Sequence, residues 1–302
     1  MTSTDRPVFR FAPSPNGELH LGHAYSALIN HAMARANNGR FLLRLEDIDR
    51  ERCTKAFERQ VLDDLVFLGI EWDEEPRRQS DHFADYAAAL ESLAAEELVY
   101  PAFMTRGEIR SFAERYREEN GHDWPRDPDG APIYPGFDRK VSTAARERKM
   151  AAGERFAWRL DMEKAIEFVP ALHWQESGEG PSGETGDIRA NPMQWGDVVL
   201  GRMDIPTSYH LSVVVDDALQ GVSDVVRGRD LFFSTSVHRL LQSLLGLPSP
   251  RYHHHDLILG SDGRKLSKSA QDTSLRALRE AGMKREDIVR MVGLREVLSE
   301  VF

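Results

Sequence analysis

The segment 13–23 constrains the fold most, because it separates an apolar run from a helical pattern. The run 8–11 predicts a buried strand, the proline and glycine residues after it force a turn, and 24–36 has the apolar spacing of a helix. His20 and His23 therefore lie at a predicted strand-to-helix junction. A helix N-terminus offers unpaired N–H groups and a partial positive charge, so this junction suits a phosphate group.

The two histidines of this junction have two interpretations. In the functional one, their imidazoles donate hydrogen bonds to the charge that develops on phosphate oxygens as pyrophosphate leaves. Gly17 and Gly22 would let backbone and nucleotide approach closely, since neither carries a Cβ. In the structural one, the pair caps the helix or packs in the core. Taken alone, the motif favours the structural interpretation.

A second motif, KLSKS at 265–269, lies near the other end of the chain. It follows a strand-like run at 256–259 and a turn at 260–263, so Lys265 and Lys268 are expected on a loop that closes over the triphosphate of ATP. A loop rich in lysine and serine is by itself more often a solvated turn. The two motifs in this order, each after a strand, together indicate an enzyme that makes an aminoacyl-adenylate from ATP.

The order of strands and helices predicts an α/β fold with a parallel sheet and an insertion. A strand at 40–45 and a helix at 56–68 continue the first unit, and the pattern breaks between 102 and 196, where 121–136 and 176–186 have the composition of loops. Later elements are expected at 211–215 (strand), 222–226 (strand), 234–245 (helix), 257–259 (strand), 274–281 (helix) and 286–291 (helix). The expected division is 1–101 and 197–260 as the halves of a catalytic domain, 102–196 as an inserted subdomain, and 261–302 as the KLSKS loop with short C-terminal helices.

Composition constrains class and location. The 302 residues carry a net charge of −10, which argues against indiscriminate nucleic-acid binding because phosphate affinity comes mainly from Lys and Arg. No apolar run approaches a membrane span, and residues 1–7 lack the basic and apolar regions of a signal peptide. The single Cys53 excludes an intramolecular disulfide. We therefore expect a cytoplasmic, monomeric protein with no membrane partner.

The motifs resemble those of class I aminoacyl-tRNA synthetases, and specifically the catalytic core of glutamyl-tRNA synthetases. Segments 9–15, 43–49, 209–217 and 224–228 carry the likeness beside the two motifs, and it is weak within the insertion. It implies a Rossmann-like nucleotide-binding fold, ATP with Mg²⁺ as cofactor, and catalytic roles for His20, His23 and Lys268. The ATP contacts that it implies are Pro13, Gly17, Gly22, Lys265, Ser267 and Lys268. The glutamate contacts that it implies are Arg10, Ala12, Ser14, Glu46, Tyr209 and Arg227.

The chemistry of glutamate agrees with these contacts. Two carboxylates require cations with planar donor geometry, and an ammonium requires an anion. Arg10 has apolar strand neighbours and Arg227 ends the run 224–226, so each needs a partner and is expected at a strand end, where open parallel sheets bind ligands. A structural ion pair is the alternative for either arginine. Glu46 is the expected ammonium partner, the Tyr209 hydroxyl suits a carboxylate oxygen, and the arginine that holds the side-chain carboxylate stays open.

The insertion departs from the family at a metal site. Shorter relatives hold zinc there through a Cys-x-Cys pair and a later Tyr-x-x-x-Cys. The corresponding residues here are Ala102, Met104, Tyr134 and Asp138. No thiolate survives among them, so we expect no zinc, and we expect packing to have taken over its structural task.

Two further polar clusters receive no catalytic role. The three histidines at 253–255 invite a metal site, but neighbours in an extended stretch point to opposite faces and do not easily converge. Asp216 and Asp217 resemble a magnesium-binding or acid–base pair. The family resemblance implies instead that they orient nucleotide or substrate.

Few residues follow Ser269 in this sequence, so we expect no anticodon-binding domain. Family members of that organisation activate glutamate without tRNA and transfer it to the queuosine base of tRNA(Asp), so the expected partner is the anticodon stem-loop that carries queuosine. The first alternative is a truncated glutamyl-tRNA synthetase that charges the acceptor end of tRNA(Glu). A non-catalytic binding protein is opposed by intact His20, His23 and Lys268, and a small-molecule ligase would share only the phosphate motifs.

Overall fold

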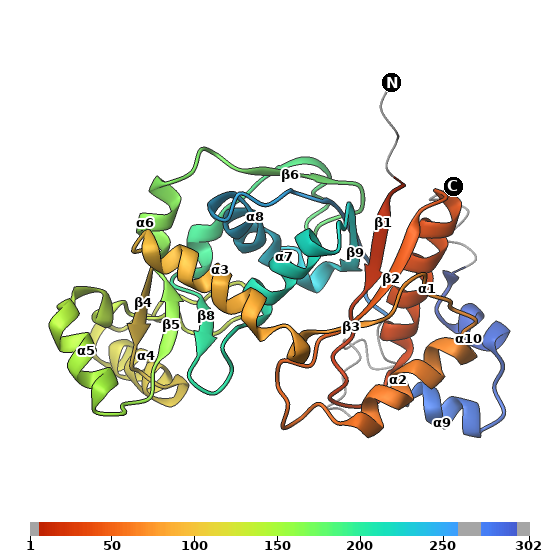
Figure 1. The fold of residues 1–302 in the computed structure, drawn as a ribbon, viewed down its shortest axis with the longest axis horizontal. Coiled ribbons are helices and arrows are strands. Elements are labelled where there is room, and N and C mark those ends of the chain that lie inside the picture. Colours follow the sequence, from red (N-terminus) through yellow and green to blue (C-terminus); the bar gives the residue numbers. More distant parts are fainter. Residues whose placement is uncertain (1–5, 259–272, 295–302) are drawn as a thin grey trace.

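The computed structural model describes residues 6–258 and 273–294, and a seven-stranded sheet forms its centre (Figure 1). The strand order is β3-β2-β1-β9-β10-β6-β7. Every neighbouring pair is parallel except β6 and β7, which form an antiparallel hairpin at one edge. The strands are β1 (Val8–Phe11), β2 (Arg40–Leu45), β3 (Arg77–Arg78), β6 (His173–Glu176), β7 (Gly186–Arg189), β9 (Asp224–Gly228) and β10 (Arg251–His255). The predicted α/β class with a parallel sheet is confirmed.

Strand β1 lies at the point where the chain order of the sheet reverses. On one side it pairs with β2, the next strand along the chain, with Phe9 opposite Phe41. On the other side it pairs with β9, with Phe9 opposite Asp224. Crevices at the carboxyl ends of strands beside such a reversal are the usual ligand sites of open parallel sheets. The connectivity therefore places the functional crevice between β1 and β9.

The helices pack in two apolar cores, of which the first lies against this sheet. In the first, α1 (Leu21–Ala36) and α2 (Lys55–Phe67) pack against the apolar side chains of β1 and β2. In the second, α3 (Phe83–Ala95), α7 (Tyr209–Leu219) and α8 (Ser234–Leu244) pack together. The helices α9 (Leu275–Glu280) and α10 (Arg285–Met291) add to the first core and confirm the two short helices predicted near the C-terminus.

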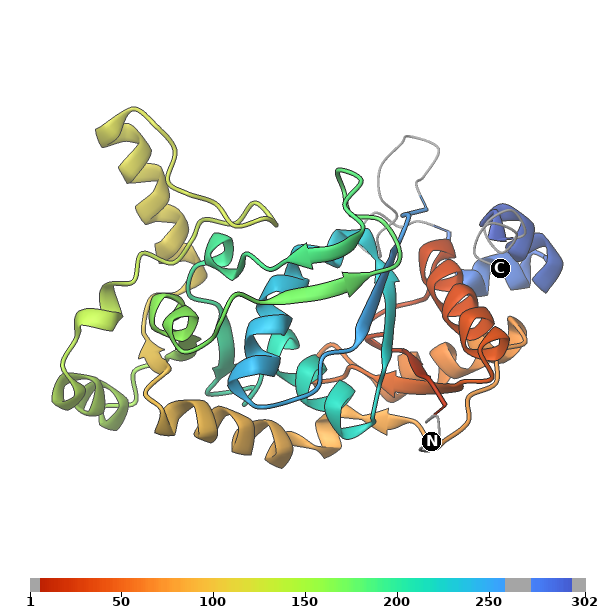
Figure 2. The ribbon, with the colours of Figure 1, turned by 90° about the horizontal axis from the view of Figure 1, so that it is seen from above.

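A small antiparallel sheet, β4-β5-β8, lies apart from the large one. It consists of β4 (Val99–Ala102), β5 (Ala157–Leu160) and β8 (Val199–Arg202). The helices α4 (Arg106–Asn120) and α5 (Thr143–Ala151) extend from it at the end of the molecule far from α1 (Figures 1 and 2). Sheet pairing divides the segment 102–196, because β5 joins the small sheet whereas β6 and β7 extend the large one. The domain boundaries themselves stay predictions.

Short elements complete the described chain. Helix α6 spans Met162–Glu167. Turns of 3₁₀ helix lie at Gln79–Asp81, Phe137–Lys140, Pro192–Trp195 and Arg229–Leu231. None of the described helices is long and apolar enough to cross a membrane. The cytoplasmic location and the monomeric state stay predictions.

Two predicted strands are wrong. The run 211–215 is part of helix α7, which is buried nearly all round from Leu211 to Asp217. A helix buried on every side shows no 3.6-residue alternation, and its β-branched run imitates a core strand. The strand predicted at 257–259 lies earlier, as β10, and Asp256–Ile258 has no regular structure while Leu259 falls outside the described residues.

Candidate functional site

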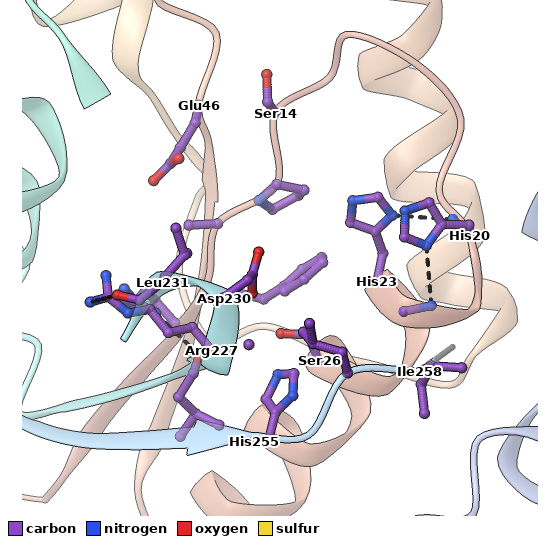
Figure 3. Close-up of a pocket in the computed structure, with 18 of the residues that line it drawn as sticks. Ser14, His20, His23, Ser26, Glu46, Arg227, Asp230, Leu231, His255 and Ile258 are labelled. Carbon is purple, nitrogen blue, oxygen red and sulfur yellow. Dashed lines mark hydrogen bonds between the residues drawn. The ribbon is translucent and has the colours of Figure 1, made fainter. Parts of the chain in front are cut away.

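A cavity of about 470 Å³ opens at the carboxyl ends of β1, β9 and β10. In Figure 3, Arg227 and Glu46 lie on one side of it and His20 and His23 on the opposite side. The cavity is lined by all six residues to which the family resemblance gives glutamate contacts, namely Arg10, Ala12, Ser14, Glu46, Tyr209 and Arg227. Pro13, Gly22, His20 and His23 also line it, whereas Gly17 does not. Lys265, Ser267 and Lys268 lie outside the described residues.

His20 and His23 form the cap of helix α1. His20 is the N-cap residue, and its Nδ1 accepts a hydrogen bond from the Gly22 N–H at 3.1 Å. The His23 Nδ1 accepts from the His20 N–H at 3.2 Å. Because Nδ1 accepts in both neutral rings, each proton sits on Nε2, which is a hydrogen-bond donor. The capping interpretation is confirmed, and it fixes the tautomer that donation to a phosphate requires.

Arg10 forms the structural ion pair that the sequence left open as an alternative. Its Nε lies 3.0 Å from Asp217 Oδ1, and Arg44 Nη1 reaches the same oxygen at 2.8 Å. Burial alone would raise the pKa of Asp217, but the charges of Arg10 and Arg44 hold it below its ordinary value. Asp216 also forms an ion pair, because its Oδ1 lies 2.8 Å from Arg77 Nε. The two aspartates therefore hold arginines in place.

Glu46 is the acidic residue among the predicted contacts. Its side chain is 14% exposed and lies 3.5 Å from Arg44 Nη2. Its backbone N–H donates to Pro13 O at 3.0 Å, which ties the end of β2 to the turn after β1. Burial raises the pKa of Glu46 to about 7, against the opposing charges of Arg44 and Arg10. The site thus holds a carboxyl group that titrates near neutrality.

Arg227 differs from Arg10 in its surroundings. It is 5% exposed, and its guanidinium is held by neutral groups such as the Tyr209 hydroxyl, 3.4 Å from Nη1. No carboxylate pairs with it among the described residues. A buried cation without a paired anion is costly unless a ligand supplies the charge. Arg10 already pairs with a carboxylate of the protein, so Arg227 is the arginine of the two whose positive charge can pair with a substrate carboxylate.

His255 lines the pocket, although the sequence suggested for it only a metal site. It ends β10 and lines the cavity, edge-on to Tyr25 with ring centroids 4.9 Å apart. Its Nδ1 lies 2.8 Å from Asp256 O and donates to it, so Nε2 keeps its lone pair. That buried Nε2 has no hydrogen-bond partner among the described residues. It can accept a hydrogen bond from a ligand N–H or O–H group.

The three histidines at 253–255 point to different surroundings, as their alternation along a strand predicts. His253 contacts Ser177 at 3.2 Å, whereas His254 is buried against Glu176 and His255 faces the cavity. Within the described residues, no group of three or more metal-ligating side chains comes together. Glu176, which contacts His254 behind the cavity, lies at the start of a stretch whose composition predicted only a loop.

The positions of the zinc ligands in related proteins are filled by packed side chains. Ala102 and Tyr134 are buried in one apolar cluster, and Met104 packs against it. The Tyr134 hydroxyl donates to the carboxylate of Asp138, which also accepts from the Phe103 N–H at 2.9 Å. Zinc at such a structural site is held by cysteine thiolates and histidine nitrogens, and these residues offer neither. The residues present do not fit a zinc ion.

A second cavity of about 640 Å³ borders the first at Tyr209. It lies between helix α4 and strands β5 and β8, and His210 also lines it. Four arginines contribute to its wall: Arg106, Arg110, Arg159 and Arg202. Asp127, Asp129 and Asp197 also line this cavity, so its lining carries charges of both signs. Guanidinium groups match phosphate oxygens in geometry and charge, so its four arginines are the groups that suit a phosphate.

Comparison with known proteins agrees with this geometry. Residues 8–300 match the family model of the catalytic domain of class I tRNA synthetases (E and Q). A "Glutamyl-Q tRNA(Asp) synthetase" of Rhodobacter capsulatus is 46% identical over 95% of this chain and 100% of its own length. A protein of the same name from Nocardia farcinica is 40% identical over 94% of this chain and 82% of its own.

Longer relatives match through part of their length. A "Glutamate–tRNA ligase 2" of Nitrosococcus oceani is 38% identical over 90% of this chain, which spans 56% of that protein. Among solved structures, a glutamate-tRNA synthetase from Elizabethkingia anophelis is similar with a TM-score of 0.72 and 26% identity, over 88% of this chain and 53% of its own.

Proposed function

Because the chain belongs to the class I tRNA synthetase family for glutamate and glutamine, we propose that it activates glutamate with ATP and transfers it to the queuosine base of tRNA(Asp). The observation that carries the first step is the cavity in which Arg227 and Glu46 lie opposite the capped N-terminus of α1 (Figure 3), with Tyr209 also in its lining. The acceptor rests on the relatives named glutamyl-Q tRNA(Asp) synthetase, one of which matches over its whole length.

The cavity supports a direct route to glutamyl-adenylate. The α-carboxylate of glutamate attacks the α-phosphorus of ATP, the new O–P bond forms, and pyrophosphate leaves with the electron pair of the broken bond. The Nε2–H groups of His20 and His23 donate to the charge that develops on phosphate oxygens. Lys265 and Lys268 are proposed to bring cations, and magnesium arrives with ATP. No side chain has to act as a nucleophile.

The arginine-lined second cavity supports an RNA partner next to this step. It adjoins the glutamate side of the first cavity at Tyr209, so a nucleoside held there would lie beside the activated amino acid. Zinc has no part in the proposal, because the packed residues at Ala102 and Tyr134 lack the donors to hold it.

The acceptor test compares glutamate transfer to three RNAs. We expect transfer to an isolated anticodon stem-loop of tRNA(Asp) that carries queuosine, and none to the same stem-loop without it. A single-stranded loop with an exposed modified base can be recognised by stacking and base-edge hydrogen bonds alone. Charging of unmodified tRNA(Glu), together with failure on the queuosine stem-loop, would decide for the acceptor-end alternative. ATP–pyrophosphate exchange without tRNA, dependent on glutamate, tests the activation step separately.

The titration of Glu46 predicts how activation depends on pH. Below its pKa of about 7 the carboxyl group is neutral and pairs poorly with the substrate ammonium. We expect kcat/KM for glutamate to rise about tenfold per pH unit below pH 7 and to level off above it, since this ratio reports free-enzyme ionisations. Measurement of exchange from pH 5.5 to 8.5 checks the slope.

Glu46→Gln is the control for this profile. The amide does not titrate, so the variant should show a lower kcat/KM for glutamate and no rise through pH 7. A wild-type profile that is flat between pH 6 and 8 would contradict the role given to Glu46.

A further inference from the structure

Within the part of the chain that the structure describes, the groups that hold Arg227 are electrically neutral. Its Nε donates to His254 Nε2 at 3.1 Å and its Nη2 to Thr235 Oγ1 at 2.7 Å. Its Nη1 donates to His238 Nδ1 at 3.2 Å. Two other partners, the Tyr209 hydroxyl and the Leu231 carbonyl, belong to residues that line the cavity. A substrate carboxylate that replaced those two would bind Nη1 and Nη2 together, in the bidentate geometry that arginine favours.

The hydrogen bond from Arg227 dictates the tautomer of His254. A guanidinium has donors only, so His254 Nε2 must accept and the ring proton must sit on Nδ1. That Nδ1 lies 2.6 Å from Glu176 Oε2 and donates to it. Burial lowers the pKa of His254 to about 4, so the ring is neutral at pH 7. The chain of bonds therefore runs from Arg227 through a neutral imidazole to a carboxylate.

Glu176 is fixed in this arrangement from the other side. Its Oε1 accepts from the backbone N–H groups of His254 and Gly178, each at 2.9 Å. Both side chains of the His254–Glu176 pair are fully buried. Gly178 is required by the close approach, since a Cβ there would lie 2.3 Å from His254 O. Burial alone would raise the pKa of Glu176, but the hydrogen bonds from His254 hold it below its ordinary value.

Arg227 and Arg10 differ in how they are connected to a carboxylate. Asp217 contacts Arg10 directly and neutralises it, whereas the negative charge of Glu176 is separated from Arg227 by one imidazole ring. Arg227 is thus oriented by an anion without being paired to it. Its charge is left for a ligand.

We propose that Glu176 is a positioning residue for substrate selection: through His254 it fixes the guanidinium of Arg227 in the orientation that distinguishes the side-chain carboxylate of glutamate from the amide of glutamine. The inference rests on the proposed use of glutamate. It assigns a role in the site to a residue on β6, at the far side of β10 from the cavity.

Glu176→Gln is the sharpest variant, because an amide cannot replace both carboxylate oxygens. If its oxygen accepts from the two backbone N–H groups, its NH₂ faces His254 Nδ1 and forces the ring proton onto Nε2. His254 Nε2–H then faces Arg227 Nε–H, donor against donor. We expect the glutamate KM in ATP–pyrophosphate exchange to rise about 10- to 100-fold, with a smaller change in kcat and none in the KM for ATP. The ratio of glutamate to glutamine activity should fall by a similar factor.

The matched control is Asp187→Asn on the same hairpin. Asp187 also pairs with a histidine, His173, at 2.8 Å, but both are exposed and neither reaches Arg227. This variant should keep the wild-type KM and selectivity. Thr235→Val is the second variant, since it removes the 2.7 Å bond to Arg227 without changing the volume of the side chain. It should also raise the glutamate KM, and it serves if Glu176→Gln fails to fold.

Nitrogen NMR of labelled histidine tests the device without substrate. The signal of His254, assigned by its loss in His254→Asn, should report a protonated Nδ1 in the wild type and a protonated Nε2 in Glu176→Gln. An unchanged tautomer, or folded Glu176→Gln and Thr235→Val proteins with wild-type KM and selectivity, would overturn the inference while glutamate activation stands. Absence of glutamate-dependent exchange in the wild type would overturn the proposed function and the selective role of Glu176 together.

Discussion

Replacing Arg227 with alanine is expected to lower kcat/KM for glutamate in ATP–pyrophosphate exchange by several hundredfold, mainly through KM. The side-chain carboxylate would enter a buried site without its cation, and breaking a buried charge pair costs about 3–5 kcal/mol. Because the direct neighbours of Arg227 are neutral, its loss leaves no carboxylate that was paired with it directly, and the buried Glu176 keeps its hydrogen bonds from His254 and Gly178. The variant should therefore fold.

Arg10→Ala is the matched comparison, since Arg10 lines the same cavity. Its removal leaves Asp217 buried with one arginine fewer, so we expect the free energy of unfolding to fall by about 3 kcal/mol, more than for Arg227→Ala. Thermal denaturation beside exchange kinetics separates the two effects. If Arg227→Ala kept the wild-type glutamate KM while Arg10→Ala lost affinity without losing stability, the roles of the two arginines would be exchanged.

Local patterns were enough to predict the first α/β unit. The strand at 40–45 coincides with β2, and the helix at 56–68 with α2 to within one residue at each end. The strand is a short, almost continuously buried run and the helix has an apolar pattern of helical period, so each signal is contained in the segment itself. The junction at His20 follows for the same reason.

Where burial depends on distant partners, the sequence was less informative. Strand β10 contains three consecutive histidines, and its burial is stabilised by bonds to Glu176 and Arg227, which come from other strands. The strand was predicted instead at the apolar run after it. The sequence of helix α7 predicts a strand, because the helix is buried on all sides and its apolar residues show no 3.6-residue period.

In the candidate site, too, residues on local motifs could be predicted, whereas residues that act through distant contacts could not. The six predicted glutamate contacts lie on motifs, and all six line the crevice at the ends of β1 and β9. The residues behind them, Glu176 and His238, belong to no motif. Their importance arises from contacts between distant positions, Glu176 with His254 and His238 with Arg227, which no local pattern encodes. Asp217 does lie in a motif, but its role in holding arginines follows only from its two arginine partners.

His20→Asn is expected to slow adenylate formation by about a hundredfold while leaving the helix intact. Asparagine is among the best N-cap residues, and its Oδ1 can accept the Gly22 N–H as the imidazole Nδ1 does now. It has no donor at the place of Nε2, so the hydrogen bond to the developing phosphate charge is lost, and one such donor is worth about 10²–10³ in kcat. Single-turnover formation of glutamyl-adenylate measures the rate directly, and thermal denaturation measures the cap.

His20→Ala completes the test because it removes both functions. It should lose the same catalytic factor and, in addition, about 1 kcal/mol of stability from the lost cap. Lys268→Ala should match His20→Asn in rate, since both are assigned to the charge of the leaving pyrophosphate, and neither should change the affinity for glutamate. If His20→Asn formed adenylate at the wild-type rate and only His20→Ala were impaired, in step with its stability, His20 would be a helix cap and nothing more. The tautomer fixed by the cap favours the first result, because it keeps the Nε2 proton on the ring at every pH where the imidazole is neutral.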